Sequence, residues 1–189
     1  MDWTAQQACD GDVQRALASG AFHQALETLV QGYQQAVVGF CANMVGDIHH
    51  GEDIAQDVFL AVYKAMPRYR QQASVRTWLF AIARRQCLKA MRDRRRRHRL
   101  EQERQDTIAA AVHRSVPQTS EDDPEQQLQR VKQSLARLGK HERALLLMRY
   151  DTGLLLTDVA HILGISEASV RRRLARALQH LREVMSDAA

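Results

Sequence analysis

The sequence predicts an all-α chain of two small helical domains joined by a flexible linker, the second of which contains a helix-turn-helix. Apolar residues recur three or four positions apart through most of the chain, and no segment alternates convincingly with a period of two. The 189 residues favour Leu, Ala, Gln and Arg and include only 3 Pro and 9 Gly. A polar stretch without periodicity, residues 99–123, separates two sets of helical stripes and is the expected linker.

Residues 21–98 are expected to form the first domain, after a weakly structured N-terminal extension over residues 1–20 that contains Cys9. Three amphipathic stripes in this domain predict three helices that cover one another's apolar sides. In order, the predicted elements are a helix from Ala21 to Val45, an interruption at Gly46 and over Asp47–Gly51, a helix that ends before Pro67, a polar loop over Arg68–Ser74, and a helix that begins near Val75. The last helix runs into the basic sequence RDRRRRHR.

Residues 124–189 are expected to form the second domain. Asp123-Pro124 is a typical helix opening, because an acidic cap is followed by proline in the first turn. The predicted elements are a helix from there to Gly139, a helix from about Glu142 to Tyr150, a short helix that Thr157 caps and Gly164 ends, and a last helix that begins at Glu167 behind the cap Ser166. A fragment of helix at Thr107–His113 is also expected within the linker.

The stretch TDVAHILGISEASVRRRLARAL predicts the helix-turn-helix. Ala160, Gly164 and Val170 supply a small residue where the helices cross, the turn, and a buried branched side chain, at the spacing of a DNA-binding unit. Such a unit places the start of its second helix in the major groove. The residues expected to face duplex DNA are Ser166, Ala168, Ser169, Arg171, Arg172, Arg173 and Arg176. The alternative is an ordinary helical hairpin with a basic, solvated face.

Charge is distributed unevenly, although the net charge is only +5. Residues 1–63 hold one arginine against eight acidic residues, and residues 64–104 hold fourteen Lys and Arg against three acidic residues. This asymmetry indicates one surface for a polyanion and another for a basic partner, with a merely solvated surface as the alternative for the acidic part.

Apolar runs are too short to cross a membrane, and the start MDWTAQQACDGD differs from a secretion signal, so the expected location is cytoplasmic.

The elements EDIAQDVF and RTWLFAIAR and the terminal helix-turn-helix resemble, in order and spacing, the extracytoplasmic-function (ECF) sigma factors of bacterial RNA polymerase. The resemblance covers about Phe22–Arg97 and Glu125–Arg182. It implies an initiation subunit that reads the upstream promoter element as duplex and the downstream element as melted strand. The implied partners are promoter DNA, the β′ clamp helices and β subunit of core RNA polymerase, and an anti-sigma factor that is often membrane-anchored. A cobalt–nickel-resistance sigma factor is the narrower hypothesis within this family.

The resemblance also implies roles for residues of the first domain. Asp53, Gln56 and Asp57 match the element that docks on the β′ clamp helices, with a solvated helix face as the alternative. The loop Arg68–Ser74 and the helix after it match the part that melts the downstream element and holds one strand. The cationic residues assigned to that strand are Arg68, Arg70, Arg76, Arg84, Arg85, Lys89 and Arg92. Trp78 lies on the apolar stripe, so we expect it mainly in the core rather than stacked on a base.

Arg85 and Lys89 occupy positions where relatives often carry Asn and Asp, which makes this helix more cationic. Arg94–Arg97 can follow phosphates or form a disordered basic tail.

Neither metal nor catalytic chemistry is expected from the remaining motifs. Three cysteines without a CxxC pair predict no disulfide framework and no closed zinc site, and Cys41 and Cys87 lie on apolar stripes. His49 and His50, considered with Cys41 and His23, offer no ligand cage. The sequence contains no Ser/His/Asp order and no phosphate-binding loop, so we expect no enzyme and no cofactor. The alternative functions are a stand-alone helix-turn-helix repressor or activator and a metal-binding sensor.

Overall fold

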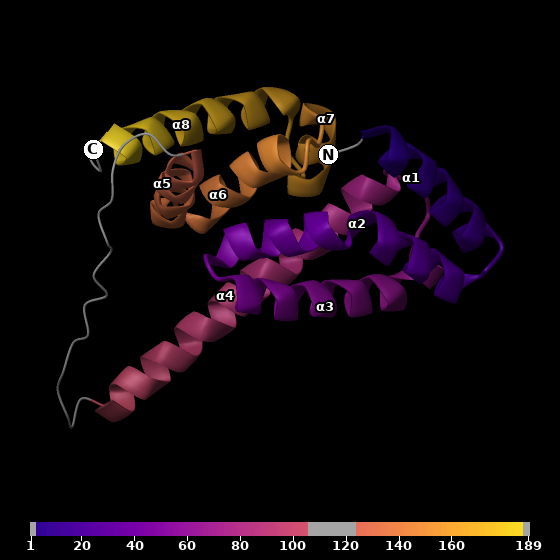
Figure 1. The fold of residues 1–189 in the computed structure, drawn as a ribbon, viewed down its shortest axis with the longest axis horizontal. Coiled ribbons are helices and arrows are strands. Elements are labelled where there is room, and N and C mark those ends of the chain that lie inside the picture. The colour runs from indigo at the N-terminus through magenta and orange to yellow at the C-terminus, as the bar shows by residue number, and fades with distance from the viewer. Residues whose placement is uncertain (1–2, 106–123, 187–189) are drawn as a thin grey trace.

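The computed structural model describes residues 3–105 and 124–186, and every regular element within these two ranges is helical (Figure 1). The elements are α1 (Trp3–Ala18), α2 (Phe22–Val45), α3 (Ile48–Ala65), the 3-10 turn η1 (Met66–Arg68), α4 (Val75–Gln105), α5 (Pro124–Arg137), α6 (Lys140–Leu146), the π-helical turn η2 (Leu147–Asp151), α7 (Leu156–Leu163) and α8 (Glu167–Ser186). This arrangement confirms the prediction of an all-α chain with two helical domains. No described helix is both long and apolar enough to cross a membrane.

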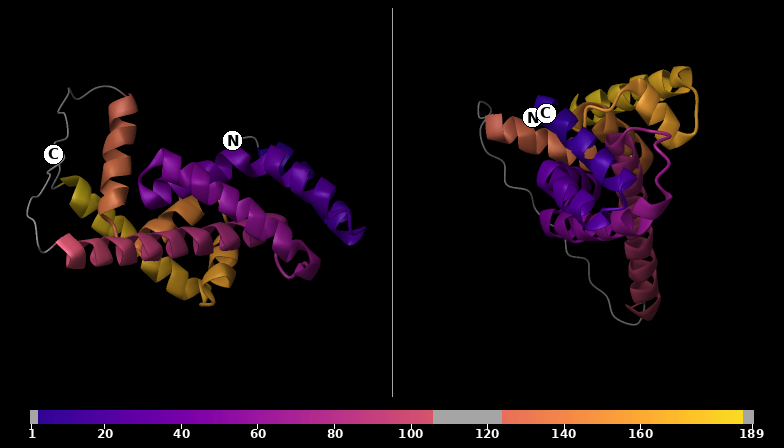
Figure 2. Two further views of the ribbon diagram at one scale, coloured as in Figure 1. Left: turned by 90° about the horizontal axis from the view of Figure 1, so that it is seen from below. Right: turned by 90° about the vertical axis from the view of Figure 1, so that its right-hand side faces the viewer.

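The first domain is built from α1 to α4, and its core confirms the predicted apolar stripes. α2 and α3 pack side by side, and α4 crosses them and continues outward as a long single helix (Figures 1 and 2). The ring of Phe80 on α4 meets Phe40 and Tyr33 of α2 edge-on, with centroid separations of 5.5 and 6.5 Å. These aromatic contacts fix the N-terminal half of α4, from which most predicted strand-binding residues project.

The predicted interruption between α2 and α3 is shorter than expected, because α3 already begins at Ile48. The Asp47 carboxylate caps α3 by accepting a hydrogen bond of 2.8 Å from the His50 backbone N–H. Gly51, which we expected in the loop, lies inside α3 where this helix touches α2. A Cβ atom at Gly51 would lie 2.6 Å from the Cα of Ala42, so the close crossing of the two helices requires glycine here.

The expectation of a weakly structured start was wrong, because residues 3–18 form α1 against α2. Val13 is fully buried between these helices. The Tyr33 hydroxyl donates a hydrogen bond of 2.7 Å to the Asp10 carboxylate, and burial raises the pKa of that carboxyl. Cys9 is half-buried rather than exposed, and its thiol donates to the carbonyl of Thr28. The N-terminal extension is therefore part of the first domain.

The second domain follows the predicted order of helices, and three further helix ends in the chain differ from prediction. α4 extends to Gln105, beyond the expected domain end at residue 98, and α6 passes directly into the π-helical turn η2. Thr157 does not cap α7; the Asp158 carboxylate does so, accepting a hydrogen bond of 3.0 Å from the Leu155 N–H. The predicted helix at Thr107–His113 and the predicted cap Asp123 lie outside the described residues.

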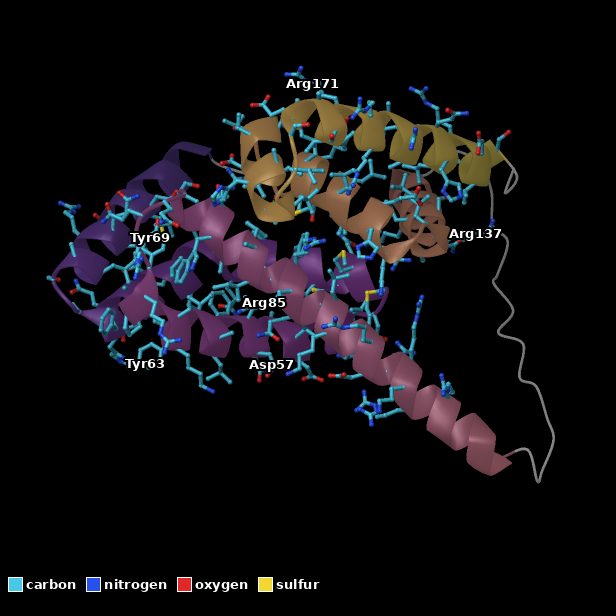
Figure 3. All side chains as sticks on the ribbon, turned by 180° about the vertical axis from the view of Figure 1, so that it is seen from behind. Asp57, Tyr63, Tyr69, Arg85, Arg137 and Arg171 are labelled. Carbon is cyan, nitrogen blue, oxygen red and sulfur yellow. The ribbon has the colours of Figure 1, made fainter. Side chains whose placement is uncertain are left out.

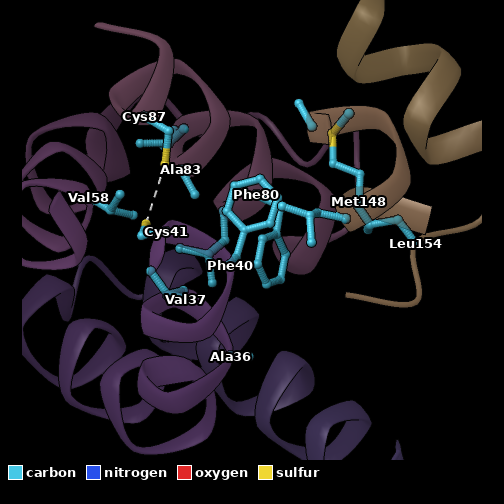
Figure 4. Close-up of a cluster of buried hydrophobic side chains, with 14 of the residues drawn as sticks. Ala36, Val37, Phe40, Cys41, Val58, Phe80, Ala83, Cys87, Met148 and Leu154 are labelled. Atoms are coloured by element: carbon cyan, nitrogen blue, oxygen red, sulfur yellow. Dashed lines mark hydrogen bonds between the residues drawn. The ribbon is translucent and has the colours of Figure 1, made fainter. Parts of the chain in front are cut away.

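The two domains pack against each other through α2 and α4 of the first and α5 to α7 of the second (Figures 1 and 2). Met148 and Leu154 of the second domain belong to the same buried cluster as Phe40 and Phe80 of the first (Figure 4). The apolar core is therefore continuous between the domains, an arrangement that the helical stripes alone do not predict.

Candidate nucleic-acid and polymerase interfaces

The helix-turn-helix has the geometry that its sequence predicts. Gly164 ends α7 in the left-handed region at φ +63°, and the Ile165 N–H returns to the Ala160 carbonyl at 3.2 Å. Ser166 caps α8, because its hydroxyl oxygen accepts from the Ser169 N–H at 3.3 Å. Ala160 and Val170 are both buried. The turn therefore fixes α8 across α7 with its outer side directed to solvent.

The outer side of α8 presents a cationic surface. Arg171, Arg172, Arg173 and Arg176 are exposed, as are Ser166 and Ala168, while Ser169 is half-buried. Arg171 forms an exposed ion pair with Glu167 at 3.4 Å, which orients its guanidinium at the start of the helix. Figure 3 shows Arg171 at the edge of the molecule farthest from α3. Six of the seven residues assigned to duplex DNA lie at the cap or in the first two turns of α8, and Arg176 lies in the third turn. Burial, together with nearby charges that include Arg173, lowers the pKa of His141, so Arg173 lies beside α6 rather than on the outermost side of α8.

The acidic face of α3 is exposed. Asp53, Gln56 and Asp57 point to solvent, while Ile54 and Val58 on the opposite side are buried. The same helix also exposes two large apolar side chains, Leu60 and Tyr63, with relative exposures of 59% and 44% (Figure 3). Sequence analysis did not assign these two residues, although their positions off the buried stripe were visible in the sequence. The surface is therefore acidic at one end and apolar at the other.

A cavity of about 190 Å³ lies at the start of α4. The rings of Tyr69 and Trp78 form part of its wall and lie 4.7 Å apart between centroids. The Tyr69 hydroxyl donates a hydrogen bond of 2.6 Å to the Ala73 carbonyl, which holds the loop against the helix. The residues that line the cavity are Arg68, Tyr69, Arg70, Gln72, Ala73, Thr77, Trp78, Ala81 and His161. Trp78 is half-buried, so it is both a core residue and a wall of this cavity.

The seven cationic residues assigned to the melted strand do not share one surface. Five of them are exposed: Arg68, Arg70, Arg85, Lys89 and Arg92. Arg84 is half-buried, and Arg76 is only 7% exposed, between α4 and the loop that precedes α7. Burial lowers the pKa of both guanidinium groups. The structure therefore places Arg76 in the contact between domains and not in the exposed cationic groove that we expected.

Arg143 and Asp158 are functional candidates that sequence analysis missed. Arg143 is buried, and its guanidinium donates to the Met44 carbonyl at 2.7 Å and to the Leu138 carbonyl at 3.3 Å. Asp158 accepts a hydrogen bond of 2.8 Å from the Thr77 hydroxyl. Both residues link the two domains, and neither carries a local sequence signal that would distinguish it from a solvated charge.

The histidines and cysteines form no cluster of metal ligands in the part of the chain that the structure describes. Cys41 and Cys87 are buried small side chains, as predicted, and their sulfur atoms lie 3.6 Å apart. The hydrogen bond from Cys87, together with burial, raises the pKa of the Cys41 thiol. His49 and His50 are exposed on the first turn of α3, beside Glu52 and Asp47 respectively.

Two sequence profiles match the two domains: Sigma-70 region 2 matches residues 29–97, and Sigma-70 region 4 matches residues 134–183. The fold and its surfaces therefore define a two-domain protein of the sigma-70 class. The chain is 31% identical to the ECF RNA polymerase sigma factor SigC of Mycobacterium tuberculosis over 173 residues, which cover 90% of each protein. It belongs to the family of ECF RNA polymerase sigma factors.

Two other curated relatives are longer than this chain. The identity is 30% both to the probable RNA polymerase sigma factor RfaY of Xanthomonas campestris and to the ECF RNA polymerase sigma factor SigG of Mycobacterium tuberculosis. The matches cover 85% and 83% of this chain but only 40% and 48% of those proteins. The chain thus spans about half the length, or less, of these two relatives.

Solved structures share the fold at low sequence identity. CnrH, in complex with the cytosolic domain of CnrY, aligns with a TM-score of 0.67 and 21% identity over 94% of this chain and 100% of that one. RpoE of Bartonella quintana, in complex with the anti-sigma factor NepR, aligns with a TM-score of 0.65 and 21% identity over 85% of this chain and 96% of that one. The hypothesis of a cobalt–nickel-resistance factor is not confirmed by these similarities and stays a prediction.

Proposed function

We propose that this chain is a sigma factor that directs core RNA polymerase to specific promoters in the cytoplasm. The observation that carries the proposal is the presence, in one chain, of an exposed cationic helix-turn-helix and of a separate exposed acidic face on α3. A stand-alone repressor or activator uses the first surface but leaves the second without a role. The combination therefore favours a subunit that binds DNA and a large protein partner together.

The upstream promoter element is the proposed ligand of α8. Arginine at the start of a recognition helix pairs with guanine edges or with phosphates in the major groove. Arg171 and Arg172, nearest the helix start, are the proposed base readers, and Arg173 and Arg176 the proposed phosphate contacts. They are exposed, and the contacts of Arg171 with Glu167 and of Arg172 with Ser169 are surface contacts within α8, so DNA can replace them without disturbing the fold.

The melted downstream element is the proposed ligand of the cavity beside Trp78. An aromatic pair with arginines at the rim suits an unstacked base and its adjacent phosphates. Arg68 and Arg70 lie at this rim, and Arg85, Lys89 and Arg92 extend the cationic surface along α4. Binding one open strand more tightly than the duplex shifts the melting equilibrium, so this task requires no catalytic residue and no cofactor.

The face of α3 is the proposed docking surface for the β′ clamp helices. Its carboxylates suit a basic coiled coil, and exposed Leu60 and Tyr63 add apolar area beside them. The second domain is the proposed partner of the β subunit. An anti-sigma factor is the proposed inhibitor, which is supported by the complex of the structural neighbour RpoE with NepR.

Run-off transcription with core polymerase on a promoter library tests the proposal. The wild-type chain is expected to direct initiation at specific sites, and Asp53→Arg with Asp57→Arg is expected to abolish it by reversing the docking charge. Asp12→Arg with Glu27→Arg makes the same change in net charge on exposed residues of α1 and α2, and is expected to retain activity. Absence of any directed initiation by the wild type, without inhibitor, would contradict the proposal.

A further inference from the structure

We propose that α1 positions the cavity beside Trp78, and that Gln14 on this helix holds Tyr69 in the cavity wall. The inference rests on the proposed function of the cavity and deepens it. The profile that matches the first domain covers residues 29–97, so it leaves α1 without an assigned role. Three observations carry the inference: the close seat of α1 on α2, a polar contact from α1 to the loop Arg68–Ser74, and the strained backbone of that loop.

The apolar side of α1 fits one place on α2. Val13 is fully buried and Ala16 is 7% exposed, and both belong to the apolar core. A Cβ atom at Gly32 of α2 would lie 2.5 Å from the Sγ atom of Cys9, so a larger residue at this crossing would displace the Cys9 side chain. The close crossing leaves α1 little freedom to slide or rotate, and the residues on its other sides therefore have defined positions.

The polar side of α1 faces the start of α4 and the loop before it. Asp10 and Gln14 are one helical turn apart, and both are half-buried. The Asp10 carboxylate accepts a hydrogen bond of 2.7 Å from the Tyr33 hydroxyl. Burial raises the pKa of the Asp10 carboxyl, while the bond from Tyr33 and the nearby charge of Arg76 lower it. Asp10 thus ties α1 both to α2 and to the first turn of α4.

Gln14 reaches the loop itself through Tyr69. Burial raises the pKa of the Tyr69 hydroxyl, and a hydrogen bond donated by the Gln14 amide lowers it. The same hydroxyl donates a hydrogen bond of 2.6 Å to the Ala73 carbonyl, so one oxygen atom connects α1 to both ends of the loop. The ring of Tyr69 packs on Trp78 in the cavity wall, near the N-terminal end of α4 (Figure 3). Gln14 therefore acts on the position of a ring that an incoming base would meet.

The loop depends on such support because its backbone is strained. Gln71, in the middle of the loop, has a left-handed backbone at φ +55°, which residues other than glycine rarely adopt. A backbone of this kind persists where the surrounding contacts hold it. Without the bond from Gln14, we expect the loop to populate other conformations, in which Tyr69 no longer packs on Trp78. Affinity for the strand then falls in proportion to the fraction of chains that keep the competent loop.

The first test follows Tyr69 through the fluorescence of Trp78 in the free, full-length chain. The sequence contains two tryptophans, so a Trp3→Phe background leaves Trp78 as the only one. Gln14→Met keeps the length of the side chain but removes its donor, and should raise acrylamide quenching of Trp78 by about half as the loop is displaced. Gln24→Met, the same substitution at an exposed position of α2, should leave the quenching unchanged. Equal quenching in the two variants would overturn the inference.

A further variant separates the hydrogen bond from packing. Gln14→Lys keeps a donor at a similar reach, so it should return the quenching of Trp78 to the level of the Trp3→Phe parent. Quenching as high as in Gln14→Met would mean that the donor does not hold Tyr69, and would also overturn the inference.

The second test measures strand binding by the complex of the full-length chain with core polymerase. The probe is a fluorescein-labelled single strand that carries the downstream element of a promoter found by the run-off assay. Gln14→Met should weaken binding of this strand about three- to fivefold, with binding of the upstream duplex and the midpoint of urea unfolding unchanged. Gln24→Met should match the wild type in all three measurements. Unchanged strand affinity in Gln14→Met, or an equal loss of duplex binding, would overturn the inference.

The two tests distinguish failure of the inference from failure of the proposed function. If the wild-type complex directs no initiation or binds no such strand, the proposed function is contradicted. The quenching of Trp78 then still decides whether Gln14 positions Tyr69, because that measurement uses neither polymerase nor DNA.

Discussion

The arginines of α8 and the arginines at the contact between domains are the same residue type in opposite environments. Arg171 and Arg172 are exposed on the outer side of α8, opposite its buried stripe. Arg76 and Arg143 are 7% and 6% exposed and face backbone and side-chain groups of the other domain. Exposed guanidinium groups keep their hydration until DNA replaces it, whereas the two terminal nitrogens of Arg143 have exchanged water for backbone carbonyls.

This difference indicates which arginines serve recognition and which serve structure. Burial lowers the pKa of Arg143 and leaves the group dependent on its carbonyl partners. Loss of this side chain is therefore expected to lower the free energy of unfolding. The loss of an exposed arginine on α8 is expected to weaken DNA binding and to leave the free energy of unfolding nearly unchanged. Substitutions in each set test whether the buried arginines govern stability and the exposed ones govern DNA binding.

The largest effect is expected for Arg143→Met, which keeps much of the side-chain volume but removes every donor. It leaves the carbonyls of Met44, Ala136 and Leu138 without this partner. The bonds to Met44 and Leu138 are buried, and each buried unsatisfied group costs about 1–3 kcal/mol. We expect the free energy of unfolding to fall by about 3 kcal/mol or more in urea denaturation. Arg172→Met, the exposed control on α8, should change it by less than about 0.5 kcal/mol. Equal stability of the two variants would remove the distinction between the sets.

A smaller and purely functional effect is expected for Arg171→Ala and Arg172→Ala. Loss of a base-reading arginine should weaken binding to the upstream duplex by about 1–3 kcal/mol, measured by fluorescence anisotropy at fixed salt. Arg182→Ala, on the same helix but four turns beyond the start of α8, is the control and should have a smaller effect. If both variants recognise promoters as the wild type does, α8 does not read bases through these residues.

The helix-turn-helix was predictable because its determinants are local. Ala160, Gly164 and Val170 act within one turn and its two helices, so their spacing alone specifies the crossing. The stripes of α2, α3 and α4 were predictable for the same reason, since each helix buries one side. Exposure of Asp53 and Asp57 followed from their positions opposite the stripe.

The contact between domains and the helix α1 were not predictable from local patterns. Thr77 and Asp158 are 81 positions apart, and either residue alone reads as a helix-start polar group. The stretch that forms α1 carries few strongly apolar residues, and its burial of Val13 depends on the surface that α2 offers. Gly51 was misplaced because a glycine inside a helix and a glycine in a loop look alike until the neighbouring backbone is known.

The finest comparison is between Arg84 and Arg85, which are adjacent in α4 but differ in environment. Arg85 is exposed on the proposed strand-binding surface (Figure 3), whereas Arg84 is half-buried and its Nε atom has no hydrogen-bond partner among the described residues.

Arg85→Ala should weaken single-strand binding by less than about tenfold and reduce the slope of log K against log salt by about 0.7, the value for one phosphate contact on a single strand. Arg84→Ala should leave this slope unchanged, because Arg84 is half-buried, and Lys132→Ala on α5 is the control for net charge. An equal loss of slope in Arg84→Ala and Arg85→Ala would mean that the strand reaches both sides of α4, which requires the second domain to have moved away.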